Sequence, residues 1–151
     1  MRIGQIFILF FATHVCFGNV ARTQSSDLVG QWKVEITFDD QTTRSLRLVA
    51  EESGIGSLLL EARSNWDEPA KPTKAKWTVG QGKSVTFSGP VEFPIGNVGR
   101  ETGVLVFRGA FESGSKITGE YAFFPMDQDM SGPKSDPTKK GKFKATRIGK
   151  P

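Results

Sequence analysis

The sequence predicts an all-β domain: an eight-stranded up-and-down antiparallel barrel, with a β-sandwich of two sheets as the alternative. Three observations lead to this. Apolar and polar residues alternate with a period of two in short runs, each run ends at Gly, Pro, Asn, Asp or Ser, and no run has the 3.6-residue period of a helix. Closing a meander of eight such strands removes the two edges that an open sheet would expose, which favours the barrel.

The first four strands are expected at residues 31–38, 43–50, 57–63 and 74–79. In the first strand, Trp32 and every second residue after it share one face. In the third strand, Ala62 is expected to face inward together with Leu58 and Leu60. The polar segment 64–73 then makes a loop that is long enough to act as a lid.

The last four strands are expected at residues 85–93, 103–111, 116–124 and 142–148. Residues 80–83, Gly-Gln-Gly-Lys, predict the hairpin that leads into the fifth strand. Gly89 and Pro90 interrupt that strand, and because proline has no N–H to donate, they predict a bulge or a sheet edge. Residues 125–140 form the second long loop.

The side chains that are expected to face inward are almost wholly apolar. They are Trp32, Val34, Ile36, Leu46, Leu48, Leu58, Leu60, Trp77, Val79, Val85, Phe87, Leu105, Phe107, Phe111, Ile117, Tyr121, Phe123 and Phe143. An eight-stranded barrel is wide enough either to be filled by such side chains or to hold one small ligand. A ligand in this interior would be hydrophobic, since a polar one would lose its hydration without gaining partners.

Residues 1–18 have the pattern of a cleavable signal peptide, with an apolar run over residues 6–12 and small residues at Cys16 and Gly18. We expect cleavage after Gly18 or a few residues later. The uninterrupted apolar run is shorter than the ~20 residues that a membrane-spanning helix needs. The mature protein is therefore predicted to be secreted or periplasmic, without stable membrane insertion.

The predicted leader contains the one cysteine and the one histidine of the chain, Cys16 and His14. After it we expect a polar lead over residues 19–27 and one barrel domain over residues 28–149. The mature chain would then have no disulfide, no thiolate nucleophile, no imidazole base and no zinc site of the usual Cys/His kind. These absences predict a protein that is not an enzyme and that carries no metal or cofactor.

The formal net charge of +4 is spread along the chain rather than gathered in one patch. Residues 139–147 are rich in lysine, and either a solvated strand face or a contact with anionic polymers of the cell envelope would account for them. Proteins that bind nucleic acids usually gather Lys, Arg and aromatic residues on one face. No nucleic-acid partner is therefore expected.

Two patterns suggest chemistry without completing a site. Residues 127–132 begin like a calcium loop, yet Thr138 stands where a bidentate carboxylate is required. Glu92, Glu101 and Glu120 lie near strand ends or loops. Because the alternation points Glu92 and Glu120 outward, no catalytic pair of carboxylates is expected.

Gly30-Gln31-Trp32 on the first strand and Arg147 near the end of the last strand resemble the arrangement in the calycins, which include lipocalins and avidin-type barrels. The resemblance implies that Trp32 lies at the barrel floor and that Arg147 packs across its ring. A guanidinium is attracted to the face of an indole, which makes this barrel closure physically reasonable. Residues 141–147 are also similar to the closing strand of small exported bacterial barrels of unassigned function.

Two functions are expected to compete. In the first, the barrel binds a small hydrophobic molecule in its interior. The side chains expected to line that site are Trp32, Trp77, Phe107 and Tyr121. In the second, the interior is filled and the chain is an interaction or inhibitor module for an envelope protein, acting through the loops around Trp66 and residues 125–132. The identity of the ligand or partner and the oligomeric state do not follow from the sequence.

Overall fold

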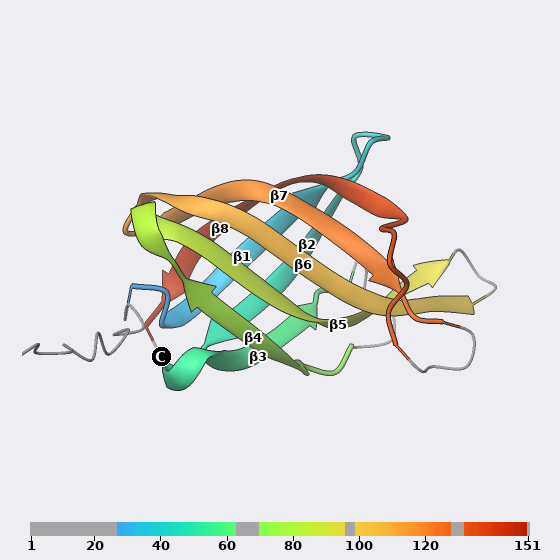
Figure 1. The fold of residues 1–151 in the computed structure, drawn as a ribbon, viewed down its shortest axis with the longest axis horizontal. Helices are drawn as coiled ribbons and strands as arrows, with labels where there is room; N and C mark the ends of the chain where they lie inside the picture. Colours follow the sequence, from blue (N-terminus) through green and yellow to red (C-terminus); the bar gives the residue numbers. More distant parts are fainter. Residues whose placement is uncertain (1–26, 63–69, 96–98, 128–131, 151) are drawn as a thin grey trace, which may run out of the picture.

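The structure, a computed structural model, describes residues 27–62, 70–95, 99–127 and 132–150. Its strands form a closed antiparallel barrel in which neighbours in sequence pair with one another and the first strand also pairs with the last (Figure 1). The strands are β1 Gly30–Thr37, β2 Thr43–Ala50, β3 Ile55–Leu60, β4 Thr73–Val79, β5 Ser84–Ile95, β6 Gly99–Ser113, β7 Lys116–Pro125 and β8 Lys139–Gly149. The predicted barrel is confirmed, and the alternative of a sandwich is wrong.

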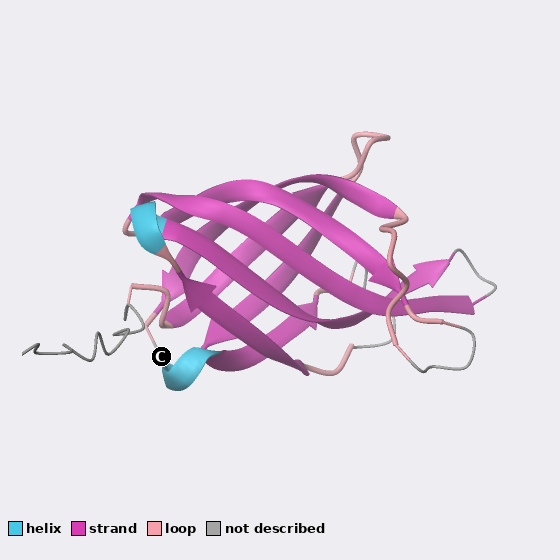
Figure 2. Ribbon diagram, viewed as in Figure 1, coloured by secondary structure: helices cyan, strands magenta, loops and turns pink. Residues whose placement is uncertain are grey.

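Short turns gather at one end of the barrel and longer connections at the other (Figure 2). Two 3-10 turns, η1 Glu52–Gly54 and η2 Gln81–Lys83, join β2 to β3 and β4 to β5 at the end where β1 begins. This end is called the narrow end below, and the end where β8 begins is called the wide end. The predicted leader 1–18, the lead as far as residue 26, and Trp66 lie outside the described residues. No helix in the described part of the chain is long and apolar enough to span a membrane.

The third strand is shorter than predicted. β3 ends at Leu60, and Ala62, which was expected to face inward, is exposed. The reason is that β4 pairs with β3 only as far as Leu58, which lies opposite Thr73. Beyond that pair no strand among the described residues is paired with β3 on this side, so the alternation in the sequence continues past the end of the sheet.

The expected irregularity at Gly89 and Pro90 is an edge and not a bulge. The ladder between β5 and β6 runs without a shift in register, and Pro90 lies opposite Val104. On its other side, β5 is paired with β4 only up to Ser88, which lies opposite Lys76. Proline is tolerated here because its missing N–H would point to a side without a ladder partner.

The last strand begins earlier than predicted. Lys139 and Lys140 pair with Phe123 and Ala122 of β7, so β8 starts three residues before residue 142. The start of β8 contains charged residues and Gly141, and it therefore lacks the apolar alternation by which a strand is recognised. The second long loop is correspondingly shorter than residues 125–140.

The barrel interior is packed with aromatic rings. Phe87 and Phe107 stack with ring centroids 4.3 Å apart, and Phe143 meets them edge-on at 5.5 and 5.2 Å. Most of the predicted inward set is buried, whereas Val79 and Phe111 are half-buried. Such ring pairs add to the stability that comes from removing apolar surface from water.

Candidate functional site

At the narrow end, Arg147 packs over the ring of Trp32. The guanidinium of Arg147 lies 4.3 Å from the centre of the Trp32 ring. It donates hydrogen bonds to the backbone carbonyls of Val29 at 2.7 Å and Gly114 at 3.1 Å, and also to that of Asp27. The indole N–H of Trp32 donates to the carbonyl of Leu28 at 2.7 Å. The segment before β1 is thus held across the floor of the barrel.

The four residues that were expected to line an interior ligand site have separate surroundings. Trp32 contacts Phe111, with ring centroids 6.0 Å apart, in addition to Arg147. The indole of Trp77 donates to the carbonyls of Glu51 and Ile55, at 3.0 and 2.7 Å, and so anchors η1. Phe107 and Tyr121 do lie together, with centroids 6.2 Å apart. Each of these rings is engaged by other parts of the chain.

The interior of the wide end is covered by side chains that reach across it. Phe38, in the turn after β1, meets both Phe93 and Tyr121 edge-on with ring centroids 6.0 Å apart. Lys139 forms an ion pair with Glu101, and its ammonium lies 5.1 Å from the centre of the Phe123 ring. These contacts place aromatic and charged side chains across this end of the barrel, above the aromatic interior.

A buried guanidinium near the mouth was missed from the sequence. Arg44 of β2 is only 5% exposed and donates a long hydrogen bond of 3.4 Å to the carbonyl of Glu61. The strand alternation contained the signal, because Arg44 has the same parity as the inward-facing Leu46 and Leu48. It was overlooked because a charged residue is seldom placed in a core.

The barrel wall has a gap between β3 and β5 at the wide end. β4 begins only at Thr73, which lies opposite Leu58 and contacts the carbonyl of Pro90, so that no stretch of β4 lies between β3 beyond Leu58 and β5 beyond Pro90. A pocket of about 390 Å³ lies in this gap, and we call it the wall-gap pocket. Its lining residues are Leu58, Leu60, Ala70, Lys71, Thr73, Pro90, Val91, Glu92, Arg100 and Thr102.

The inner end of the wall-gap pocket is fixed by one hydroxyl. Thr73 Oγ1 lies 2.6 Å from the carbonyl oxygen of Pro90 on β5 and 3.1 Å from that of Leu58 on β3. The first residue of β4 therefore bridges the two strands that border the gap. Because a hydroxyl has a single proton to donate, it stabilises one of these contacts at a time.

Beyond Ser88, the side of β5 that faces β4 has no ladder partner among the described residues, and we call it the free edge of β5. Two prolines limit what can occupy this edge. The carbonyl of Pro90 points toward β4, since it accepts from Thr73, and the missing N–H of Pro90 would point the same way. Pro94 has the same strand parity, and it pairs with Arg100 in the same unbroken ladder. The free edge thus lacks two of the donors that an added strand would need.

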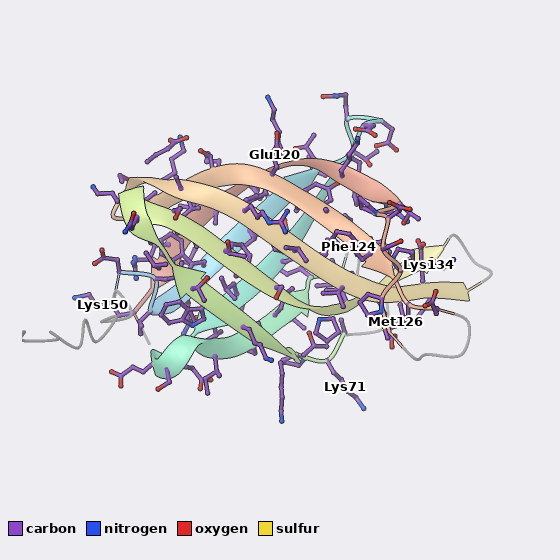
Figure 3. The ribbon with its side chains drawn as sticks, in the orientation of Figure 1. Lys71, Glu120, Phe124, Met126, Lys134 and Lys150 are labelled. Atoms are coloured by element: carbon purple, nitrogen blue, oxygen red, sulfur yellow. The ribbon has the colours of Figure 1, made fainter. Side chains whose placement is uncertain are left out.

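The outer lip of the wall-gap pocket is charged. Arg100 and Glu92 form an ion pair at 3.7 Å, on the side of β5 and β6. Lys71 lies on the opposite lip, in the segment before β4, and Figure 3 shows its side chain directed away from the barrel. The pocket thus combines buried leucine and valine side chains with a polar rim.

Two other hollows are lined by residues that the structure describes. One, of about 730 Å³, is lined mainly by polar residues of the β1–β2 turn, β7 and β8, and Tyr121 lies at its base. Burial, with a smaller effect of the nearby carboxylates of Asp39 and Asp40, raises the pKa of Tyr121 to about 12. The other, of about 380 Å³, is formed by the loop after β7. Among the described residues no group of three or more His, Cys, Asp or Glu side chains could hold a metal ion.

Comparison with protein-family models and with curated proteins finds no match. Among solved structures, the chain is similar to a redesigned β-barrel, with 14% sequence identity and a TM-score of 0.45 over 83% of this chain and 95% of that one. The assignment of the fold therefore rests on the strand ladders of the chain itself. The calycin resemblance stays a prediction.

Proposed function

We propose that the chain is an exported, non-enzymatic barrel that binds a small apolar or amphipathic molecule, and that it does so in the wall-gap pocket. The observation that carries this proposal is the wall-gap pocket itself, with a volume of about 390 Å³. Leu58, Leu60 and Val91, which are 1%, 7% and 4% exposed, form its apolar side. A mostly apolar hollow of this size with a few polar groups is the usual form of a small-molecule site.

The packing of the barrel favours the wall over the interior as the place of binding. Phe87, Phe107 and Phe143 are in mutual contact in the centre. A ligand there would have to displace rings from a close-packed core, whereas the wall-gap pocket requires no such rearrangement. The missing donors at Pro90 and Pro94 also favour a small molecule over an added peptide strand.

The test is a titration with N-phenyl-1-naphthylamine, an uncharged probe whose fluorescence rises in apolar surroundings. We expect saturable binding to the wild-type chain, and a loss of roughly tenfold or more in affinity for Leu60→Trp, which fills the pocket. Ile55→Trp is the matched control, because Ile55 is 53% exposed on the outer face near the narrow end. Absence of binding, or unchanged binding to Leu60→Trp, contradicts the proposal.

The same titration separates the wall from the interior. Phe107→Ala enlarges the packed centre without touching the wall-gap pocket. If binding depended on the interior, Phe107→Ala would change the affinity for the probe and Leu60→Trp would leave it unchanged. That result would favour the site predicted around Trp32, Trp77, Phe107 and Tyr121.

A second candidate, an interaction module of the cell envelope, is supported by an apolar strip outside the barrel. Val104 lies opposite Phe124 and Val106 opposite Ala122 on the outer face of β6 and β7, and all four are partly exposed. Figure 3 shows Phe124 on this wall. A photo-crosslinking residue at position 124 would test it in the native host: a specific covalent adduct supports a protein partner, and its absence favours the small-molecule proposal.

A further inference from the structure

The wall-gap pocket has two chemically different parts. Its inner part consists of Leu58, Leu60 and Val91, which also belong to the hydrophobic core of the barrel. Its outer part consists of Lys71, Glu92 and Arg100, which lie on the lips of the gap. A molecule that fills both parts must itself be amphipathic. An apolar group at the rim would make no polar contacts there, and a polar group in the inner part would lose its hydration without gaining hydrogen-bond partners.

The charge on the lips is unbalanced. Glu92 is paired with Arg100 at 3.7 Å, and these two charges offset each other. Lys71 forms no ion pair with any carboxylate of the residues that the structure describes, and the same holds for Lys74, which follows it on the exposed face of β4. Among the described residues, the lips of the wall-gap pocket thus carry two cationic side chains, Lys71 and Arg100, and one carboxylate, Glu92, and this excess of positive charge complements a negative group.

We propose that the wall-gap pocket selects anionic amphiphiles, with the apolar part against Leu58, Leu60 and Val91 and the anionic head between Lys71 and Arg100. This inference rests on the proposed function and narrows it to a class of ligand. The gap makes the geometry suitable, because it opens sideways through the wall. The tail can reach the buried leucines while the head stays at the rim, in contact with water.

The experiment compares ligands that share a twelve-carbon chain and differ in the head. Dodecanoate, dodecyl phosphate, dodecyl maltoside and dodecyltrimethylammonium are titrated calorimetrically below their micellar concentrations, at low and at moderate salt. We expect the two anionic compounds to bind about three- to fivefold tighter than the neutral one, the effect of one partly exposed charge, and the cationic one to bind weakest. Moderate salt should reduce this preference. The two anionic arms distinguish a carboxylate from a phosphate head.

Two charge-reversal variants complete the test. Lys71→Glu should abolish the preference for anionic heads while retaining the affinity for dodecyl maltoside, since the apolar part of the pocket is unchanged. Lys83→Glu, an equal change in η2 at the narrow end, should keep the wild-type order. Equal affinities for all four heads overturn this inference and leave the proposed function standing. If none of the four compounds binds and the uncharged naphthylamine probe does not bind either, the proposed function fails as well.

Discussion

Arg147, near the end of β8, lies over the ring of Trp32 on β1, with its guanidinium 4.3 Å from the centre of the indole. The two residues join the first and last strands of the barrel and also hold the segment that precedes β1. A cation over an aromatic face contributes about 0.5–2 kcal/mol, depending on how far it is desolvated. The hydrogen bonds from Arg147 to the carbonyls of Val29 and Gly114 make the contact directional.

Replacing Trp32 with alanine should destabilise the barrel by about 3–5 kcal/mol, because a fully buried ring is lost and a cavity remains. Equilibrium unfolding in urea measures the difference. Ile148→Ala serves as the control, since Ile148 is 51% exposed and should change the stability by less than about 0.5 kcal/mol. A loss below about 1 kcal/mol for Trp32→Ala would mean that this ring does not close the barrel.

Replacing Thr73 with valine should widen the wall-gap pocket at nearly constant side-chain volume. The variant removes the hydroxyl that contacts the carbonyls of Pro90 and Leu58, which should cost about 1 kcal/mol of stability and weaken binding of the naphthylamine probe. Thr78→Val is the matched control on the exposed face of the same strand. Equal effects of the two substitutions on probe binding would show that the Thr73 hydroxyl does not shape the pocket.

Replacing Pro90 and Pro94 together with valine should promote self-association. The double variant restores two N–H donors to the free edge of β5 and adds residues that favour strands, so that this edge can pair with another chain. Sedimentation velocity at increasing protein concentration is the measurement. Pro137→Val, in the exposed loop before β8, should leave the chain in its wild-type association state. A double variant that sediments like the wild type would argue against edge protection by these prolines.

Tyr121 should remain neutral at a pH where an ordinary tyrosine is ionised. Burial raises its pKa to about 12, from 10.0 for an exposed tyrosine. Since the folded state holds the proton more tightly than the unfolded state, its contribution to stability is complete below about pH 10 and is lost as the pH rises through about 12. The expected loss between these pH values is roughly 2–3 kcal/mol.

The measurement for Tyr121 is direct, because the chain contains one tyrosine. Absorbance of the tyrosinate followed against pH should give a midpoint near 12 for the folded chain and near 10 for the chain in denaturant. Unfolding curves at pH 9 and pH 11 should differ by about 1.4 kcal/mol, half of the full loss, because at pH 11 the unfolded state is largely ionised and the folded state is not. A folded-state midpoint near 10 would show that the hydroxyl is accessible to water.

The fold and much of the interior could be predicted from the sequence because side chains in a strand alternate strictly. Trp32, Phe107 and Tyr121 were placed inward on parity alone, and all three are buried. The same rule applied to Arg44 would have placed it inward as well. Arg44 was not predicted to be buried, because charged side chains are rarely found in a core. Buried cations do occur where carbonyl oxygens accept hydrogen bonds from them.

The wall-gap pocket could not be predicted, because it depends on where three strands end relative to one another. The late start of β4 at Thr73 and the extension of β5 to Ile95 become meaningful only once the register between them is known. Strand ends are also the least predictable part of a sheet, as the early start of β8 at Lys139 shows. Pro90 was recognised as an irregularity, but its role at a gap in the wall required the neighbouring ladder.

The pairing of β1 with β8 determines when the chain can finish folding. Val29 and Arg147, which share a hydrogen bond, are 118 positions apart in the sequence, so the barrel closes only when almost the whole chain is available. Until β8 is available, β1 and β7 each lack one neighbouring strand. A chain without β8 would be an open sheet with two unpaired edges that can pair with other chains. If the protein is exported as proposed, the barrel cannot close before its last strand has crossed the membrane, and the chain stays open during transport. Loss of only the final strand should then be as damaging as loss of the first.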